Sequence, residues 1–421
     1  MQQRTRTTLI LLAAICALAA GCGDGKEEVR AVTISKGGKH TAKVVQSGKK
    51  QYVVVDDERV GDKYDAVGPA VFSEPLLAPD TPGPDGRHAS IAFTAKSGRE
   101  QFVVKDGKRI GDKYDATSSP VFSPSGSVAF SARVGNKMFV VKDGKKIGKD
   151  HDFVHPPVFN PDGSSIAYSV RDKGGECVIS NGKQVGGKYG RIRSLVFSPN
   201  GKSIAFIAGH GLTVFIVKDG VQVSQEYPEY IGTPVFSPDS ASLLFAVLSG
   251  DRCIIFRDGA PASREFDMIG TPVFSPDGSS LAYAAMENRK WFIVRDDVRM
   301  SDGYDLIRTP AFSPDGSSLA FAAMKWKGGS PGTGNPRWLV VRDGAIVGAK
   351  YEDVQDLVFS PDGRSLAFAA RSGGKWFIIK NDDQVGGPYD AVSAIETSAN
   401  GTKLAFTGIR EGTASVVEIP W

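Results

Sequence analysis

The chain has 421 residues, of which 41% are hydrophobic and 23% are charged, a balance that excludes wholesale disorder and a multi-span membrane protein. Its formal net charge of +4 is spread over the whole length, which excludes the concentrated basic field that nucleic-acid binding needs. The 49 glycines and 24 prolines favour many short strands joined by turns over an all-helical fold.

The N-terminus has the pattern of a targeting segment. Arg4 and Arg6 are followed by an uncharged apolar run, which is too short to span a bilayer permanently, and then by small residues before Cys22. The segment Leu-Ala-Ala-Gly-Cys resembles a bacterial lipobox, in which the cysteine is acylated after cleavage. The resemblance implies a lipoprotein signal peptide at 1–21, lipidation of Cys22 and a tether at 22–30. An ordinary secretory peptide with an incidental cysteine is the alternative.

From about residue 31 to residue 421 the sequence repeats itself. Copies of Phe-Ser-Pro-Asp-Gly, with small variations, recur every 37 to 39 residues, except for a last interval of 47. The phenylalanines of the strong copies are Phe122, Phe159, Phe197, Phe236, Phe274, Phe312 and Phe359. Weaker copies near Val32, Phe72 and Ile395 extend the array to ten repeats.

Each repeat predicts four short strands. The first is stopped by Pro-Asp-Gly, in which proline fixes φ and glycine takes a positive φ. The second is a Leu-Ala-Phe segment such as residues 319–323, the third resembles residues 291–294, and an Asp-Gly hairpin signal leads to a fourth that ends in Tyr-Asp, as in residues 110–115. Four strands per roughly 40 residues is the spacing of a propeller blade.

The Leu-Ala-Phe strand decides between all-β architectures. Its large and small side chains alternate, and neither face is polar, so that both faces of each sheet must be covered. We therefore predict an all-β fold, a β-propeller of about ten four-stranded WD-like repeats. One large ring and two smaller tandem rings are both open, and we favour one ring because no linker divides the array near residue 230.

Phe-Ser-Pro-Asp-Gly followed by Leu-Ala-Phe or Leu-Ala-Tyr resembles the WD-like repeats of TolB-type bacterial propellers, and it is similar to the propeller of prolyl-oligopeptidase relatives. The repeats lack the terminal Trp-Asp and the Gly-His pair of eukaryotic WD repeats. Together with the lipobox at Cys22, the resemblance implies a repeat lipoprotein of the bacterial cell envelope, anchored to a membrane on its periplasmic or outer-surface side.

Tyr-Asp pairs at the end of the fourth strand invite two interpretations. Carboxylates at one level in successive blades could bind a cation or an amine. Alternatively, each Asp caps backbone donors in the loop to the next blade, and each aromatic ring packs between blades. We favour the structural interpretation because a folding device repeats with the unit. The pairs are Tyr64-Asp65, Tyr114-Asp115, Tyr304-Asp305 and Tyr389-Asp390, with His151-Asp152 and Phe266-Asp267 as variants.

Two insertions break the repeat, at residues 74–85 and 325–337. Long loops on a rigid scaffold commonly carry binding, and tryptophan and arginine are enriched in binding hot spots. The second insertion gives the candidate binding residues Lys325, Trp326, Lys327, Arg337 and Trp338. A tolerated flexible loop without a binding role is the alternative.

Motifs of catalysis are nearly absent. Residues 328–332 match Gly-x-Ser-x-Gly literally but lie in a loop between strands, where a nucleophile elbow would not form. The five histidines lack paired zinc spacing, and Cys177 and Cys253 are expected to be buried small apolar residues. We predict no enzyme activity, no catalytic residues, no metal and no cofactor.

The sequence thus predicts a lipid-anchored propeller that binds or scaffolds an envelope protein and does not bind nucleic acid. The alternative is a propeller that binds a glycan or a small ligand, through the 325–337 insertion or a central opening. A propeller hydrolase with its residues gathered at the axis is a further alternative that we rank below both.

Overall fold

A computed structural model describes residues 27–35, 40–73, 89–228, 231–326, 336–392, 395–398, 401–411 and 413–421. The predicted signal peptide and Cys22 lie outside these described residues. All regular elements in these ranges are β-strands, and they form ten small antiparallel sheets. The fold is an all-β β-propeller of ten blades, which confirms the predicted fold class. None of the described residues belongs to a helix that is long and apolar enough to cross a bilayer.

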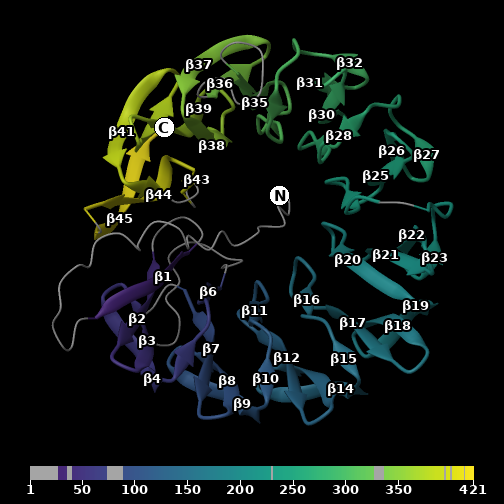
Figure 1. Ribbon diagram of the computed structural model, residues 1–421, viewed down its shortest axis with the longest axis vertical. Coiled ribbons are helices and arrows are strands. Elements are labelled where there is room, and N and C mark those ends of the chain that lie inside the picture. Colours follow the sequence, from purple (N-terminus) through teal and green to yellow (C-terminus); the bar gives the residue numbers. More distant parts are fainter. Residues whose placement is uncertain are drawn as a thin grey trace. The chain divides into compact units, whose positions relative to one another are not determined.

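The blades are numbered in chain order, and Figure 1 labels their strands. Blades 1 to 4 contain β1 (Glu28–Ile34), β2 (Thr41–Ser47), β3 (Lys50–Val55), β4 (Glu58–Tyr64), β5 (Ala66–Val67), β6 (Val71–Phe72), β7 (Ile91–Ser97), β8 (Glu100–Lys105), β9 (Lys108–Tyr114), β10 (Ala116–Thr117), β11 (Val121–Phe122), β12 (Val128–Val134), β13 (Lys137–Lys142), β14 (Lys145–His151), β15 (Phe153–Val154), β16 (Val158–Phe159), β17 (Ile166–Asp172), β18 (Gly175–Ser180) and β19 (Lys183–Tyr189). Blade 5 contains β20 (Arg191–Phe197), β21 (Ile204–His210), β22 (Thr213–Lys218) and β23 (Val221–Gln222).

Blades 6 to 9 continue the same pattern, and the described part of blade 10 contains its first three strands. They contain β24 (Val235–Phe236), β25 (Leu243–Ser249), β26 (Arg252–Arg257), β27 (Ala260–Pro261), β28 (Met268–Ile269), β29 (Val273–Phe274), β30 (Leu281–Glu287), β31 (Lys290–Arg295), β32 (Val298–Arg299), β33 (Leu306–Ile307), β34 (Ala311–Phe312), β35 (Leu319–Lys325), β36 (Arg337–Arg342), β37 (Ala345–Tyr351), β38 (Asp353–Phe359), β39 (Leu366–Ser372), β40 (Lys375–Lys380), β41 (Asp383–Tyr389), β42 (Ala391–Val392), β43 (Glu396–Thr397), β44 (Lys403–Arg410) and β45 (Thr413–Pro420).

The chain divides into two compact units, which we describe separately. Blades 1 to 4 belong to the N-terminal unit, blades 6 to 10 belong to the C-terminal unit, and the division falls within blade 5, after Ile204. In most blades a first strand, often in two short pieces, pairs with the second, which pairs with the third, which pairs with the fourth. β1 begins at Glu28, inside the segment 22–30 that the sequence predicts as a tether.

Turn chemistry explains why each repeat folds back on itself. At the turn between the third and fourth strands of blade 2, Asp106 takes a left-handed φ of 49° and accepts a hydrogen bond from the amide of Ile91 at 2.8 Å. The carboxylate therefore ties this turn to the start of the second strand. Asn181 and Asn381 make the same bond to Ile166 and Leu366 in blades 4 and 9.

Each interior blade buries both faces of its sheet, as the alternation of Leu-Ala-Phe requires. In blade 3, Phe130 points to one side, where its cluster includes Val103 of blade 2. Ala129 points to the other side, where its cluster includes Tyr168 of blade 4. Large side chains of one blade thus meet small side chains of the next, which is how a row of flat sheets reaches native packing density.

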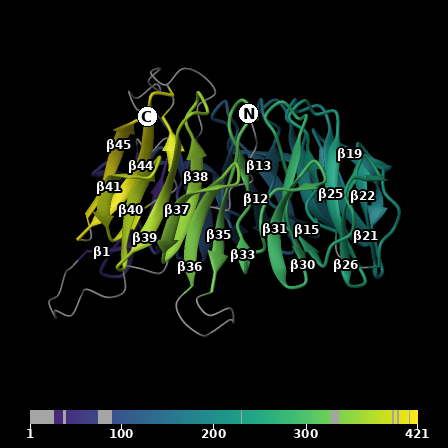
Figure 2. The same cartoon turned by 90° about the horizontal axis from the view of Figure 1, so that it is seen from above.

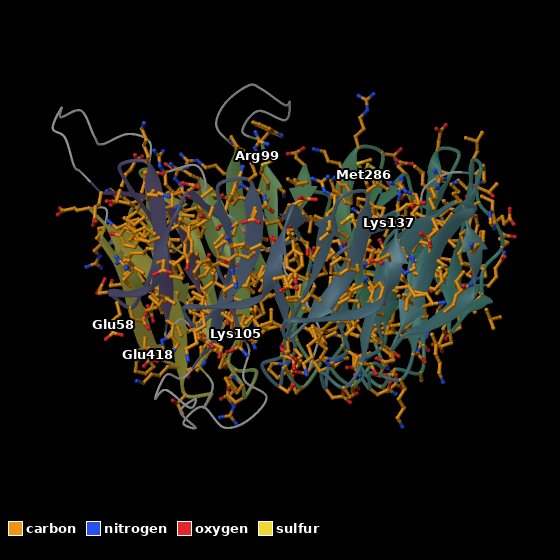
Figure 3. The ribbon with its side chains drawn as sticks, turned by 90° about the horizontal axis from the view of Figure 1, so that it is seen from below. Glu58, Arg99, Lys105, Lys137, Met286 and Glu418 are labelled. Atoms are coloured by element: carbon orange, nitrogen blue, oxygen red, sulfur yellow. The ribbon has the colours of Figure 1, made fainter. Side chains whose placement is uncertain are left out.

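The strands run between two ends of each blade. Arg99 lies at the turn between the second and third strands, which we call the 2–3 turn, and Lys105 lies beside the turn between the third and fourth strands, the 3–4 turn. Figures 2 and 3 show strands crossing the full depth of the blades, and Figure 3 places Arg99 and Lys105 at opposite ends of blade 2. Glu58, beside the 3–4 turn of blade 1, lies at the same end as Lys105.

Candidate binding surface on blades 7 to 9

The aromatic residues of the repeated Tyr-Asp pairs pack between blades. Tyr64 closes blade 1, and its ring contacts Phe93 and Phe102 of blade 2 edge-on, with ring centroids 6.1 and 5.7 Å apart. Its hydroxyl accepts a hydrogen bond from the amide of Asp62 at 3.1 Å. Burial raises the pKa of Tyr64, which keeps this hydroxyl neutral. The aromatic half of the structural interpretation is confirmed.

The carboxylates of these pairs also have structural partners. Asp65 accepts a hydrogen bond from the amide of Gly98, at the 2–3 turn of the next blade, at 2.6 Å, and it pairs with Lys50 of its own blade at 2.8 Å. The cap is therefore on the following 2–3 turn and not in the connecting loop, where the sequence analysis expected it. Because Asp305 and Asp390 are held in the same way, these carboxylates are engaged in linking blades.

A third link repeats at the opposite end of the blades. Arg295, beside the 3–4 turn of blade 7, lies 5.2 Å from the ring centroid of Phe312 in blade 8 and donates to the carbonyl of Gly316 at 3.1 Å. Lys105 of blade 2 makes the equivalent contacts with Phe122 and Gly126 of blade 3. The residues that repeat are thus explained by the fold, and a binding surface has to be sought where the repeat is broken.

The broken repeat lies at the 2–3 turn of blade 8, between β35 and β36. Lys325 and Arg337 are paired across the two strands, and both side chains are exposed. Trp338 is paired with Met324 and is buried, whereas Trp326 is half-buried against the core of blades 8 and 9. The structure therefore brings four of the five candidate residues together, and the fifth, Lys327, lies outside the described residues.

Blade 7 anchors the start of this insertion. The amide of Trp326 donates to Asp305 at 2.7 Å, and the other carboxylate oxygen of Asp305 accepts from Lys290 at 2.6 Å. Burial acts to raise the pKa of Asp305, but the hydrogen bonds from Lys290 and Trp326 outweigh it and lower the pKa overall. The ammonium of Lys325 lies 4.7 Å from the ring centroid of Tyr304, a cation–π distance.

Arg308 joins the insertion to blade 9. Its guanidinium carbon lies 4.4 Å from the ring centroid of Trp338, and it also donates to the carboxylate of Asp353 at 2.7 Å and to the carbonyl of Val354. A planar guanidinium that stacks on an indole and binds a carboxylate in the next blade fixes all three groups. Arg308 could not be identified as a site residue from the sequence, because an arginine in a first strand carries no sign of the groups that it contacts in the next blade.

Two further tryptophans stand at the equivalent position of the neighbouring blades 7 and 9. Trp291 of blade 7, Trp338 of blade 8 and Trp376 of blade 9 pair with the tyrosines Tyr304, Tyr351 and Tyr389 of their fourth strands. Trp291 and Trp376 are half-buried, so that part of each indole faces solvent near the 2–3 turns. The sequence contained the signal, since tryptophan is the second residue of the third strand in three successive repeats, but only the insertion was predicted as a binding site.

Exposed cations lie at the 2–3 turns of blades 8 and 9. Lys325 and Arg337 on blade 8 and Arg371 and Lys375 on blade 9 are exposed, with Arg371 3.9 Å from Glu352 and Lys375 paired with Asp390. Half-buried tryptophan beside exposed arginine and lysine is suited to binding an acidic and partly apolar surface. We call the surface formed by Lys325, Trp326 and Arg337, above the buried Trp338, the blade 8 patch.

The remaining candidates are placed as follows. Cys177 is buried, Cys253 is half-buried, both thiols are free, and burial raises the pKa of each. His151 takes the place of the tyrosine in blade 3, where its Nδ1 lies 2.7 Å from a carboxylate oxygen of Asp172 in the next blade. Across the described ranges no three His, Cys, Asp or Glu side chains are grouped to hold a metal ion.

No protein-family model matches the chain, and no curated protein matches it. Among solved structures, it is similar to a eukaryotic initiation factor, with 12% identity over 78% of this chain and 95% of that one and a TM-score of 0.45. TolB from Acinetobacter baumannii matches with 19% identity over 60% of this chain and 73% of that one, with a TM-score of 0.31. The propeller domain of Cps50 (Swd1) from Myceliophteria thermophila matches with 14% identity over 62% and 95%, with a TM-score of 0.30.

Proposed function

We propose that this protein is a non-enzymatic binding propeller of the bacterial cell envelope, anchored by a lipid on Cys22, which presents the blade 8 patch to a protein partner. The observation that carries the proposal is the contrast between the repeat and its one described break. The repeated carboxylates, aromatics and cations link blade to blade, whereas Lys325 and Arg337 extend from a break in the repeat toward solvent.

The chemistry of the patch favours a protein as its partner. Trp338 contacts Arg308, the backbone of Trp326 is held by Asp305, and the Trp326 side chain packs on the blade 8 and 9 core, so that the patch needs little ordering when it binds. Packed indoles beside exposed cations match the anatomy of protein interfaces, in which buried aromatic anchors are surrounded by a polar rim. A hydrophobic and acidic partner surface would complement it.

The first experiment is capture of partners from bacterial envelope extract with the full-length chain as bait. We expect a bound protein to be lost with Arg337→Glu and with deletion of residues 327–336. The matched control is Arg99→Glu, which reverses an exposed cation at the 2–3 turn of blade 2 and should leave capture unchanged. Capture that is equal for all these variants would overturn the assignment of the patch.

The second experiment tests the anchor. The full-length chain expressed in a bacterium should incorporate labelled palmitate and sediment with membranes, and Cys22→Ser should abolish both. Labelling that persists in Cys22→Ser would refute lipidation at this residue. Processing of Cys22→Ser without lipid would instead support the ordinary secretory signal.

A glycan is the second candidate ligand, because half-buried indoles such as Trp291 and Trp376 also stack on sugar rings. A glycan array probed with the full-length chain distinguishes the two. Binding to a defined glycan that is lost with Trp376→Ala but kept by Arg337→Glu would favour the sugar, since stacking and not charge would then carry the affinity.

A further inference from the structure

Blade 1 departs from the other nine blades at one position of its second strand. In the other blades this position holds an aromatic residue that is at most 2% exposed. These residues are Phe93, Phe130, Tyr168, Phe206, Phe245, Tyr283, Phe321, Phe368 and Phe406. In blade 1 the position holds Lys43, whose side chain is 29% exposed. In blade 1 a cation thus occupies the position at which blades 2 and 3 bury a ring against the preceding blade.

The residues around Lys43 form a pocket of about 380 Å³ on one face of blade 1. Register places Lys43 opposite Val54 and Val45 opposite Tyr52, and Val54 opposite Arg59, so that these side chains share a face of the sheet. Val45 and Tyr52 are buried and form the floor. The exposed cations of Arg59 and Lys63 lie 5.9 and 5.3 Å from the ring centroid of Tyr52.

The pocket has more positive than negative charge. Lys43, Arg59 and Lys63 line it together with two carboxylates, Glu27 and Asp57. Asp57 pairs with Lys43 at 3.1 Å, whereas Lys63 donates to the hydroxyl of Ser47 and Arg59 donates to the carbonyl of Gly61. Within the described part of the chain, Arg59 and Lys63 therefore have no carboxylate partner.

Glu27 indicates what the pocket accepts. Glu27 lines the pocket together with Tyr52, and the interaction of its carboxylate with the tyrosine hydroxyl, followed by burial, raises the pKa of Tyr52. A carboxylate is thus already accommodated against the tyrosine hydroxyl and among the cations.

The other blades indicate the shape of a larger ligand. On this same face blade 2 receives the Tyr64-Asp65 pair, with the ring against Phe102 and the carboxylate on the amide of Gly98. Blade 1 has Tyr52 at the position of Phe102 and Gly48 at the position of Gly98, and no carboxylate among the described residues accepts from the amide of Gly48. The receiving groups are therefore present in blade 1, with added positive charge.

We propose that the pocket formed by Lys43, Val45, Tyr52, Val54, Arg59 and Lys63 binds an extended acidic segment of a partner protein, which places a carboxylate among the three cations and an apolar side chain against Tyr52. Charge complementarity selects the acidic side chains, and the docking of Tyr-Asp pairs onto the equivalent face elsewhere gives the extended, aromatic and acidic character. This site is separate from the blade 8 patch and does not depend on it.

The test is fluorescence anisotropy at low salt with the full-length chain and a fluorescein-labelled peptide, Glu-Tyr-Asp-Glu-Tyr-Asp, with blocked ends. Lys43→Phe, which installs the residue that other blades carry, and Arg59→Gln with Lys63→Gln should each weaken binding at least tenfold. The matched control, Arg109→Gln with Lys113→Gln, alters the equivalent exposed cations of blade 2 and should leave affinity unchanged. The neutral peptide Gln-Tyr-Asn-Gln-Tyr-Asn should not bind.

Several outcomes would overturn the proposal. If Lys43→Phe and the Arg59 and Lys63 variant both bind the acidic peptide as tightly as the wild-type chain, the peptide does not bind in this pocket. If the wild-type chain binds the neutral peptide as tightly as the acidic one, charge does not determine binding. If inorganic phosphate, added at the same concentration as the peptide, displaces the peptide, the site binds anions in general and is not specific for an acidic peptide. Self-association measured by sedimentation, if lost in Lys43→Phe, would assign the face to a second copy of this chain. Should Lys43→Phe melt below the wild-type chain, the Arg59 and Lys63 variant decides, since both side chains are exposed.

Discussion

The amide of Trp326 donates a hydrogen bond to the carboxylate of Asp305, 2.7 Å away, in the connection that leads from blade 7 to blade 8. The bond is the blade 8 version of a link that each of several Asp side chains makes with the next 2–3 turn. An insertion that breaks the sequence repeat has therefore kept the structural anchor of the repeat. The scaffold holds the first residue of the insertion in the same way that it holds an ordinary turn.

We predict that Asp305→Ala loosens this insertion without unfolding the protein. It removes the acceptor of the Trp326 amide and leaves Lys290 unpaired, a local loss of about 1 kcal/mol, or roughly fivefold in the population of the open form. Limited trypsin digestion should cleave after Lys325 about fivefold faster. Asp305→Asn, which keeps an acceptor oxygen, should be intermediate, and an unchanged cleavage rate in Asp305→Ala would show that the anchor contributes nothing.

The aromatic contacts between blades should contribute most of the stability per residue. Phe130 is fully buried and meets Tyr114 edge-on at 5.9 Å, so that Phe130→Ala should cost about 3–5 kcal/mol through the lost burial and the cavity. Leu212→Ala, at a side chain that is 85% exposed, should change stability by less than about 0.5 kcal/mol. Urea midpoints measured side by side check the contrast, and similar midpoints would contradict the packing argument.

A substitution at Gly111 tests how closely the fourth strand of blade 2 approaches Gly144 of blade 3. The φ of Gly111 is +75°, and an added Cβ would lie 2.7 Å from the hydroxyl of Tyr114 and 3.5 Å from Gly144 of the next blade. Gly111→Ala should therefore cost about 2–4 kcal/mol, from backbone strain and from the clash. Gly135→Ala has a similar φ of +59° with open space around the Cβ, so that its cost should stay near 1 kcal/mol. Equal losses in thermal denaturation would mean that strain alone matters.

The Phe-Ser-Pro-Asp-Gly turns should make the fold acid-sensitive. Hydrogen bonds from Ser275 and Ser279 lower the pKa of Asp277 to about 2, and Ser313 and Ser317 do the same for Asp315. Because these folded-state values lie below the ordinary 3.8, the stabilisation is complete above about pH 4 and is lost as the pH falls toward 2.

Neutral variants of these turns measure that effect. Asn200 already occupies the equivalent position in blade 5 and accepts from Ser198 at 2.8 Å, so that Asp277→Asn with Asp315→Asn should fold. Between pH 5 and pH 2.5 its melting temperature should fall less than that of the wild-type chain. Parallel curves for the two proteins would place the acid sensitivity elsewhere. Ser275→Ala, in contrast, should lower the melting temperature at neutral pH as well, because Ser275 also accepts from the amide of Ser280.

The fold was accessible from the sequence because its physics is local and repeated. Because both faces of the Leu-Ala-Phe strand are apolar, each sheet needs a neighbouring sheet on both sides. The structure meets this requirement, since Phe130 is buried toward blade 2 and Ala129 is buried toward blade 4. The Tyr-Asp pairs were assigned a structural role correctly, but the backbone donor to the carboxylate was misplaced. Sequence proximity suggested a donor in the adjoining loop, whereas the fold supplies one from the next 2–3 turn.

The candidate surfaces were less accessible. Lys325 and Arg337 were found because an insertion is visible in one dimension. Arg308 was not found, since its partners Trp338 and Asp353 are 30 and 45 residues away and meet it only after three strands have paired. The substitution of Lys43 for an aromatic ring is visible in an alignment of the repeats, but its meaning depends on knowing which face of blade 1 it occupies.

The links from Lys105 and Arg295 to the following blade have a consequence for how such a chain can change over time. Every connection of this kind joins a blade only to its immediate successor. A DNA segment that encodes one unit carries both halves of the joint, so that duplication or loss of such a segment leaves matching partners on either side of the new junction. The length of the array is thus open to change by recombination, whereas single residues at the joints are constrained on two sides.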